Sequence, residues 1–188
     1  MVEDRTARQI AFYDRGVGSG WWQKISGLAF GVGLARNVRD CYRFIFENYE
    51  AGDRIFLFGF SRGAATVRSL SYFIHLFGIL PHSRPELIDK AWRIYKWTPA
   101  ALLEARAREF IGRHHTMWTT VEFLGCYDTV AALGMPYRWA SVLLDNFPGL
   151  RHRFHNFDLS PSVVHAYHAL AIDDERKTFH PLLWEPIE

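Results

Sequence analysis

The feature that most constrains this chain is a five-residue turn between an apolar strand and a helix. Residues 55–58 form a run of large apolar side chains, Gly-Phe-Ser-Arg-Gly follows at 59–63, and a helix-compatible segment begins at Ala64. This context is typical of a nucleophile elbow, which holds a serine on a sharp turn at the end of a strand. Because strand and helix pass close together there, we expect side chains at Gly59 and Gly63 to clash.

Ser61, at the centre of this turn, is the candidate nucleophile. The helix that follows would direct its first N–H groups and the positive end of its dipole toward an anion forming at the serine. The alternative is a tight turn in which the Ser61 hydroxyl only caps the helix. The flanking pattern favours the nucleophile.

Composition narrows the class of protein. A chain of 188 residues that is 49% hydrophobic can bury a core, and it is most simply one domain over 1–188. A net charge of +2 with scattered arginines is typical of a solvated surface and does not favour nucleic acid as a partner. Two cysteines, Cys41 and Cys126, provide neither a disulfide framework nor metal-ligand spacing. No metal and no organic cofactor is implied.

The sequence also bears on targeting. Residues 1–6 are polar and unlike a signal peptide, and no apolar run is long enough to span a bilayer. We therefore expect a soluble chain without a transmembrane segment, cytoplasmic as synthesised. Any export is expected to use a route that needs no signal peptide.

Hydrophobic patterns predict alternating strands and helices. Ser160 and Pro161 look like the cap and first residue of a helix. The helices between 86 and 110 are either a lid over the site or an ordinary insertion. The elements expected are a strand at 10–13, a helix at 34–49, a strand at 55–58, a helix at 64–80, two helices between 86 and 110 broken near 98–99, a strand at 121–126 and a helix at 161–171. This order indicates an α/β fold with a mainly parallel sheet flanked by helices.

Asp128 lies just past the carboxyl end of the expected strand 121–126 and downstream of Ser61. A serine hydrolase of α/β architecture keeps its triad acid in this place, where the carboxylate orients an imidazole and stabilises its charged form. The alternative is an aspartate that caps a local turn or helix.

Several stretches together resemble the α/β-hydrolase domain of type VI secretion phospholipase effectors and their uncharacterised relatives. The resemblance runs in order from about residue 9 to 186. It is carried by Tyr-Asp-Arg-Gly-Val-Gly at 13–18, by the elbow segment 52–64 with Phe before the serine and Arg after it, by Phe-Leu-Gly-Cys-Tyr-Asp-Thr-Val at 123–130, and by 166–176 with 179–184.

The resemblance implies an α/β-hydrolase-like fold and a mechanism. Ser61 would be the nucleophile, Asp128 the triad acid, and the backbone N–H of Arg62 an oxyanion donor. The implied activity is hydrolysis of carboxylic esters through an acyl-enzyme, with phospholipid acyl esters as the leading substrates. A lipid or small ester would be the substrate, and a secretion partner is a further expectation.

Two segments of the family pattern have no counterpart in the sequence given. They are an opening strand with an Asp-Gly-Thr-like turn and a His-x-Asp-x-Gly-Gly-like segment that carries the catalytic histidine. We therefore expect a partial domain with an incomplete sheet.

Within these residues His168 is a candidate base, and the favoured alternative is a buried, hydrogen-bonded structural histidine. His165 and His168 are spaced one helical turn apart, but no Glu or Cys joins them at a ligand interval, so no metal site is predicted. The alternatives to an active hydrolase are an inactive truncated fragment that needs a complementing chain, and a lipid- or partner-binding module that keeps the fold.

Overall fold

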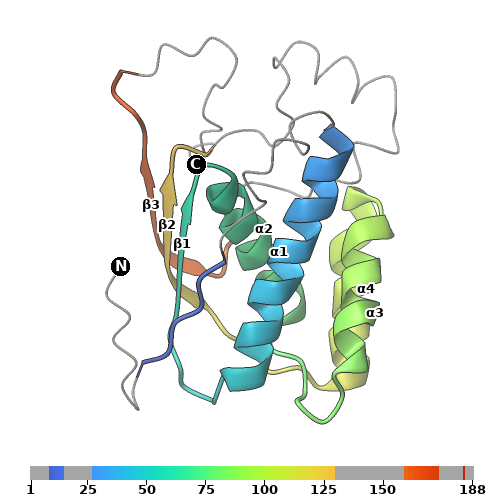
Figure 1. Ribbon diagram of the computed structural model, residues 1–188. Helices are drawn as coiled ribbons and strands as arrows, with labels where there is room; N and C mark the ends of the chain where they lie inside the picture. Colours follow the sequence, from blue (N-terminus) through green and yellow to red (C-terminus); the bar gives the residue numbers. More distant parts are fainter. Residues whose placement is uncertain (1–8, 15–26, 130–158, 174–183, 185–188) are drawn as a thin grey trace.

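The structure is a computed structural model that describes residues 9–14, 27–129, 159–173 and Trp184. Within this part of the chain lie four helices and three strands (Figure 1). In chain order they are α1 (Gly27–Asn48), β1 (Ile55–Phe60), α2 (Arg62–Phe77), α3 (Glu86–Trp97), α4 (Ala100–His114), β2 (Val121–Tyr127) and β3 (Val163–Ala169).

The three strands form one parallel sheet in the order β1-β2-β3. Phe60 at the end of β1 is in register with Tyr127 at the end of β2, and Tyr127 with Ala169 at the end of β3. Parallel strands place their carboxyl ends at the same edge of a sheet, and this is where open α/β sheets bind ligands. The expected α/β fold with a parallel sheet is confirmed.

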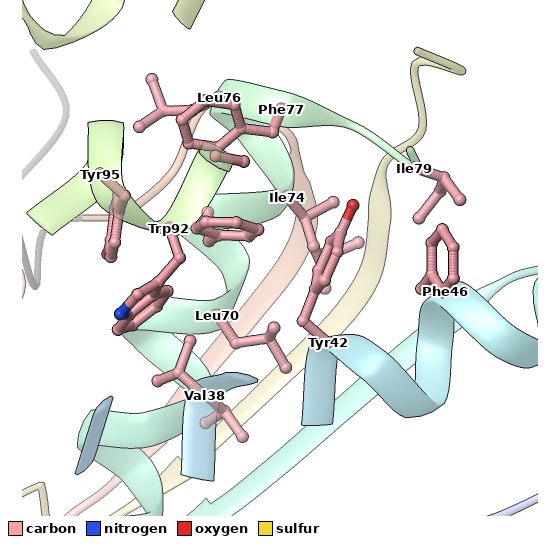
Figure 2. Close-up of a cluster of buried hydrophobic side chains, with 14 of the residues drawn as sticks. Val38, Tyr42, Phe46, Leu70, Ile74, Leu76, Phe77, Ile79, Trp92 and Tyr95 are labelled. Carbon is pink, nitrogen blue, oxygen red and sulfur yellow. The ribbon is translucent and has the colours of Figure 1, made fainter. Parts of the chain in front are cut away.

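Helix α2 forms the centre of the core. It packs against β1 and β2 on one side and against α1 and α4 on the other, while α3 packs on α4. Figure 2 shows side chains of α1 and α3 meeting those of α2, and Phe73 of α2 makes edge contacts with Tyr42 at 4.7 Å and Tyr95 at 5.2 Å between ring centroids. Most buried residues of α2 are apolar, as a helix buried on most sides requires, and the buried polar ones are Thr66, Arg68, Ser69 and Ser71.

The two helices after α2 are separated where the sequence predicted. Thr98, the residue before Pro99, takes an extended conformation with ψ of 133°, as a following proline favours. The buried side chains of α3, including Leu87, Ala91 and Tyr95, belong to the core cluster. This packing supports the alternative of an ordinary helical insertion.

The expectation of a helix at 161–171 is wrong, because Val163–Ala169 is strand β3. Pro161 and Ser162 form a turn instead of a first helical turn. The Ser162 carbonyl accepts a hydrogen bond from Val121 N–H at 2.9 Å, and its hydroxyl lies 2.6 Å from His75 Nδ1 of α2. Pairing along β2 therefore overrides the local helix signal, and the β-branched Val163 and Val164 suit a strand.

The expected strand at 10–13 is also not found. Gln9 forms a single bridge, and residues 10–14 have no regular secondary structure. Phe12 instead stacks on Phe44 of α1 with 5.1 Å between ring centroids. The apolar residues of this segment are thus used for packing rather than for strand pairing.

The charged surface agrees with the composition. Arginines of α1 and α4 pair with acids one turn away, as in Arg36 with Asp40 at 3.5 Å, and both side chains are exposed. Such pairs stabilise a surface only slightly. None of the helices in the described ranges is long and apolar enough to cross a membrane.

One face of the described sheet carries aromatic side chains that no described helix covers. Phe56, Phe58 and Phe60 of β1 are 49%, 60% and 68% exposed. Phe123 contacts both Phe58 and Tyr167, with ring centroids 5.3 and 5.4 Å apart. We call Phe56, Phe58, Phe60, Phe123, Tyr127 and Tyr167 the aromatic face. Among the described strands β1 pairs only with β2.

The aromatic face should make the isolated chain bind apolar dyes and associate as its concentration rises, because contiguous exposed apolar surface favours both. The variant Phe58→Ser should weaken dye fluorescence and shift light scattering toward monomer. Leu102→Ser serves as the control, since Leu102 is similarly exposed but lies on α4. Equal dye binding by Phe58→Ser and the unmodified chain would contradict this assignment.

Candidate active site

Ser61 occupies a sharp turn between β1 and α2. Its backbone has φ of 54° and ψ of −114°, a region that residues with a side chain rarely adopt. Ser61 N–H donates to the carbonyl oxygen of Tyr127 at 2.8 Å, which ties the turn to the end of β2. Its side chain makes no capping hydrogen bond to α2. The capping alternative therefore gains no support, and the geometry is that of a serine raised on a strained turn.

The two glycines of the turn differ from one another. A Cβ at Gly59 would lie 2.3 Å from the carbonyl oxygen of Gly63 and 2.6 Å from Ala64 N, so only glycine fits there. A Cβ at Gly63 would meet no atom within 4 Å. The expected clash is confirmed at Gly59 and wrong at Gly63. The backbone of Gly63 passes over Gly59, but its own Cβ position points into open space.

Among the described residues, the N–H groups of Arg62 and Gly63, the first two of α2, have no hydrogen-bond partner. The Ser61 carbonyl accepts from Ala64 N–H at 3.1 Å and Ala65 N–H at 3.4 Å. The N–H groups of Arg62 and Gly63 come before these donors and have no helical acceptor of their own. They lie at the positive end of the helix dipole, beside the serine. This arrangement fits the predicted oxyanion donor at Arg62, which stays a prediction.

Asp128 follows β2 directly and is held from β3. Its Oδ1 accepts a hydrogen bond from Ala171 N–H at 2.6 Å, and its own N–H donates to the Ala169 carbonyl at 2.9 Å. Its φ of 44° marks a second strained turn. The carboxylate partner is 43 positions away in sequence, so this is neither a local turn cap nor a helix cap. Among the described residues Oδ2 makes no hydrogen bond.

The sheet brings Ser61 and Asp128 to neighbouring strand ends. They follow Phe60 and Tyr127, which are register partners, at the carboxyl edge of the sheet. No histidine in the described part of the chain is hydrogen-bonded to Ser61. His152, His155 and His180 lie outside the described residues.

His168 lies on β3, where sequence reasoning expected a helix. Its Nε2 accepts a hydrogen bond from Thr129 N–H at 3.3 Å, and its ring lies 5.2 Å from that of Trp184. Burial, and then the cation of Arg68, lower the pKa of His168, while Asp128 opposes them. The favoured expectation was a buried, hydrogen-bonded histidine: the hydrogen bond is present, but the side chain is only half-buried. His165 is exposed on the opposite face, because side chains alternate along a strand.

The two cysteine thiols are unreactive near neutral pH. Burial raises the pKa of the Cys126 thiol to about 11 and that of Cys41 to about 12, so both stay protonated near neutral pH. Within the described ranges no three His, Cys, Asp or Glu side chains come together as a metal site.

Two hydrogen bonds of the site were missed from the sequence, those of Thr129 with His168 and of Ala171 with Asp128. Both depend on β3 being a strand. The β-branched Val163 and Val164 and the aromatic Tyr167 were the signal that could have indicated it.

Comparison with known proteins places the chain among its relatives. A family model described as "T6SS, Phospholipase effector Tle1-like, catalytic domain" matches residues 1–188. Among curated proteins, "Uncharacterized protein YEL023C" of Saccharomyces cerevisiae is 27% identical over 208 residues, which covers 97% of this chain. The chain spans 28% of the length of that protein. No solved structure matches.

Proposed function

This chain belongs to the family of Tle1-like phospholipase effector catalytic domains, and from that premise we propose that it hydrolyses lipid acyl esters with Ser61 as the nucleophile. The observation that carries the proposal is the strained Ser61 turn, whose side chain does not cap α2. Strained backbone persists where the surrounding structure imposes it, and it is concentrated at reactive sites.

The proposed reaction has two halves. Ser61 Oγ attacks the acyl carbonyl carbon while a histidine base takes its proton, and the oxyanion is stabilised by Arg62 N–H. When the carbon–oxygen bond breaks, the proton passes to the leaving alcohol, and an acyl group remains on Ser61. Water then attacks this ester with the same base, which releases a fatty acid and restores the serine.

Asp128 would act on the histidine base, which it orients, rather than on the substrate. With Oδ1 held by Ala171 N–H, Oδ2 is left to accept from a histidine Nδ1–H and fix its tautomer. The base itself is proposed to lie outside the described residues or on a complementing chain.

The variant Asp128→Asn tests this role. Its side-chain oxygen can still accept from Ala171 N–H, but an NH₂ group would face the imidazole. We expect release of fatty acid from phospholipid vesicles, and of nitrophenol from a short acyl ester, to fall about 10²- to 10⁴-fold. Asp173→Asn is the control, because Asp173 is exposed in the turn after β3. A rate within twofold of the unmodified chain would count against the triad role.

The aromatic face favours a second candidate, a lipid- or partner-binding module without catalysis. Exposed aromatic side chains suit an interfacial contact. Flotation with phospholipid vesicles that persists in Ser61→Ala, with no fatty acid released by the unmodified chain, would favour this second function.

A further inference from the structure

Besides the bond from Asp128 N–H to the Ala169 carbonyl at 2.9 Å, two further hydrogen bonds from the side of β3 hold the turn that carries Asp128. Ala171 N–H donates to Asp128 Oδ1 at 2.6 Å, and the next residue, Thr129, donates its own N–H to His168 Nε2 at 3.3 Å. Thr129 is fully buried, so its N–H has no access to water as a substitute partner. One of the two bonds fixes the carboxylate and the other fixes the backbone beside it.

We propose that His168 is a positioning residue, which holds the Asp128 turn in place by accepting the Thr129 N–H and does not itself act on the substrate. This inference rests on the proposed function, because it assigns the turn a task in catalysis. It assigns His168 a supporting task beside Asp128 in place of the role of base.

The tautomer required by the bond supports this assignment. A neutral imidazole has one N–H donor and one acceptor nitrogen. Since Nε2 accepts from Thr129, the proton is on Nδ1, and the only lone pair that could take a proton from Ser61 is already in use. His168 also points to the α2 side of the sheet, where its register partner Cys126 is buried.

The surroundings of the ring hold it in place. Trp184 packs against it at 5.2 Å between ring centroids, and the Arg68 guanidinium lies 5.2 Å from the Trp184 ring. Among the described residues, the charged or titratable groups around His168 are Arg68 from α2, Asp128 after β2 and the protonated Cys126 thiol of β2. Burial and the Arg68 cation lower the pKa of His168, which keeps the acceptor nitrogen unprotonated.

Lowering the pH should break the hydrogen bond between Thr129 and His168 and so release the turn that carries Asp128. A protonated imidazole has two donors and no acceptor, so it cannot bind Thr129 N–H. Because the pKa of His168 is lower in the folded chain than its ordinary value of 6.5, the unfolded chain takes up the proton first as pH falls. The stabilising contribution is therefore complete above about pH 6.5 and is lost below it.

Two variants of His168 distinguish a positioning role from a role as the catalytic base. In His168→Gln, the amide oxygen can reach the place of Nε2 and accept the Thr129 N–H, but it cannot act as a base. In His168→Leu, both abilities are lost. Ester hydrolysis should stay within about threefold of the unmodified chain in His168→Gln and fall about 100-fold in His168→Leu, the effect of a misplaced catalytic group. The acid limb of the pH profile should also weaken in His168→Gln. If His168 is the base, both variants lose activity equally, which would overturn the proposal.

A second measurement is independent of catalysis. Hydrogen exchange followed by mass spectrometry should show faster exchange at Thr129 and Ala171 in His168→Leu, with normal exchange in His168→Gln. Unchanged exchange in His168→Leu would overturn the positioning role even if the chain is an active esterase. If exchange responds as expected but the unmodified chain releases no fatty acid, the proposed function fails, and His168 supports the turn only.

Discussion

Replacing Ser61 with alanine should reduce ester hydrolysis by about 10⁴- to 10⁶-fold, because the group that attacks the acyl carbon is removed. The fold should survive, since the Ser61 side chain makes no capping bond and alanine tolerates the turn no worse than serine. Initial rates at saturating ester, measured beside thermal unfolding, test both statements.

A second serine provides the control for this substitution. Ser71 is buried in α2, and its hydroxyl donates to the Arg68 carbonyl at 2.8 Å. Ser71→Ala removes a hydroxyl from the same helix without touching the turn, so its activity should stay near that of the unmodified chain. Hydrolysis by Ser61→Ala at a similar rate to Ser71→Ala would show that another group attacks the ester.

Gly59→Ala should destabilise the chain by about 3 kcal/mol or more, the upper range for forcing an atom into a packed site. The added Cβ would lie 2.3 Å from the Gly63 carbonyl oxygen, and the atoms it meets are backbone atoms that cannot rotate away. Denaturant unfolding measures the loss. We expect a lower midpoint with a slope close to that of the unmodified chain.

Gly63→Ala is the matched control within the same turn. A Cβ there meets nothing within 4 Å, and alanine favours a helix over glycine by up to about 1 kcal/mol. Its unfolding midpoint should therefore be unchanged or higher. Equal destabilisation by the two alanines would mean that β1 and α2 do not approach each other at Gly59.

The sequence was most informative where structure depends on neighbouring residues. The apolar run of β1, the glycine at 59 and the helical pattern of α2 together predict the elbow, because all three signals lie within about 25 residues. The place of Asp128 was predicted for the same reason, since it needs only the end of one strand. The clash at Gly63 was not predictable in this way. It depends on the direction of one Cβ, which the motif does not specify.

The pairing of strands that are distant in sequence could not be predicted from the sequence. Ser160 and Pro161 signal a helix start, yet the same residues also fit a turn, and pairing of Val163–Ala169 with β2 selects the turn. The contacts of Asp128 with Ala171 and of Thr129 with His168 follow only from that parallel register. The pairing of β2 with β3, two segments distant in sequence, therefore determines the contacts of Asp128 and His168.

The central claim, that Ser61 is an activated nucleophile, is tested most directly by covalent labelling. The folded chain is incubated with a fluorophosphonate, and its intact mass is compared with that of Ser61→Ala. The account predicts one adduct, located at Ser61 by peptide mapping and absent from the variant. A folded chain that forms no adduct, or one labelled equally in the variant, would contradict it.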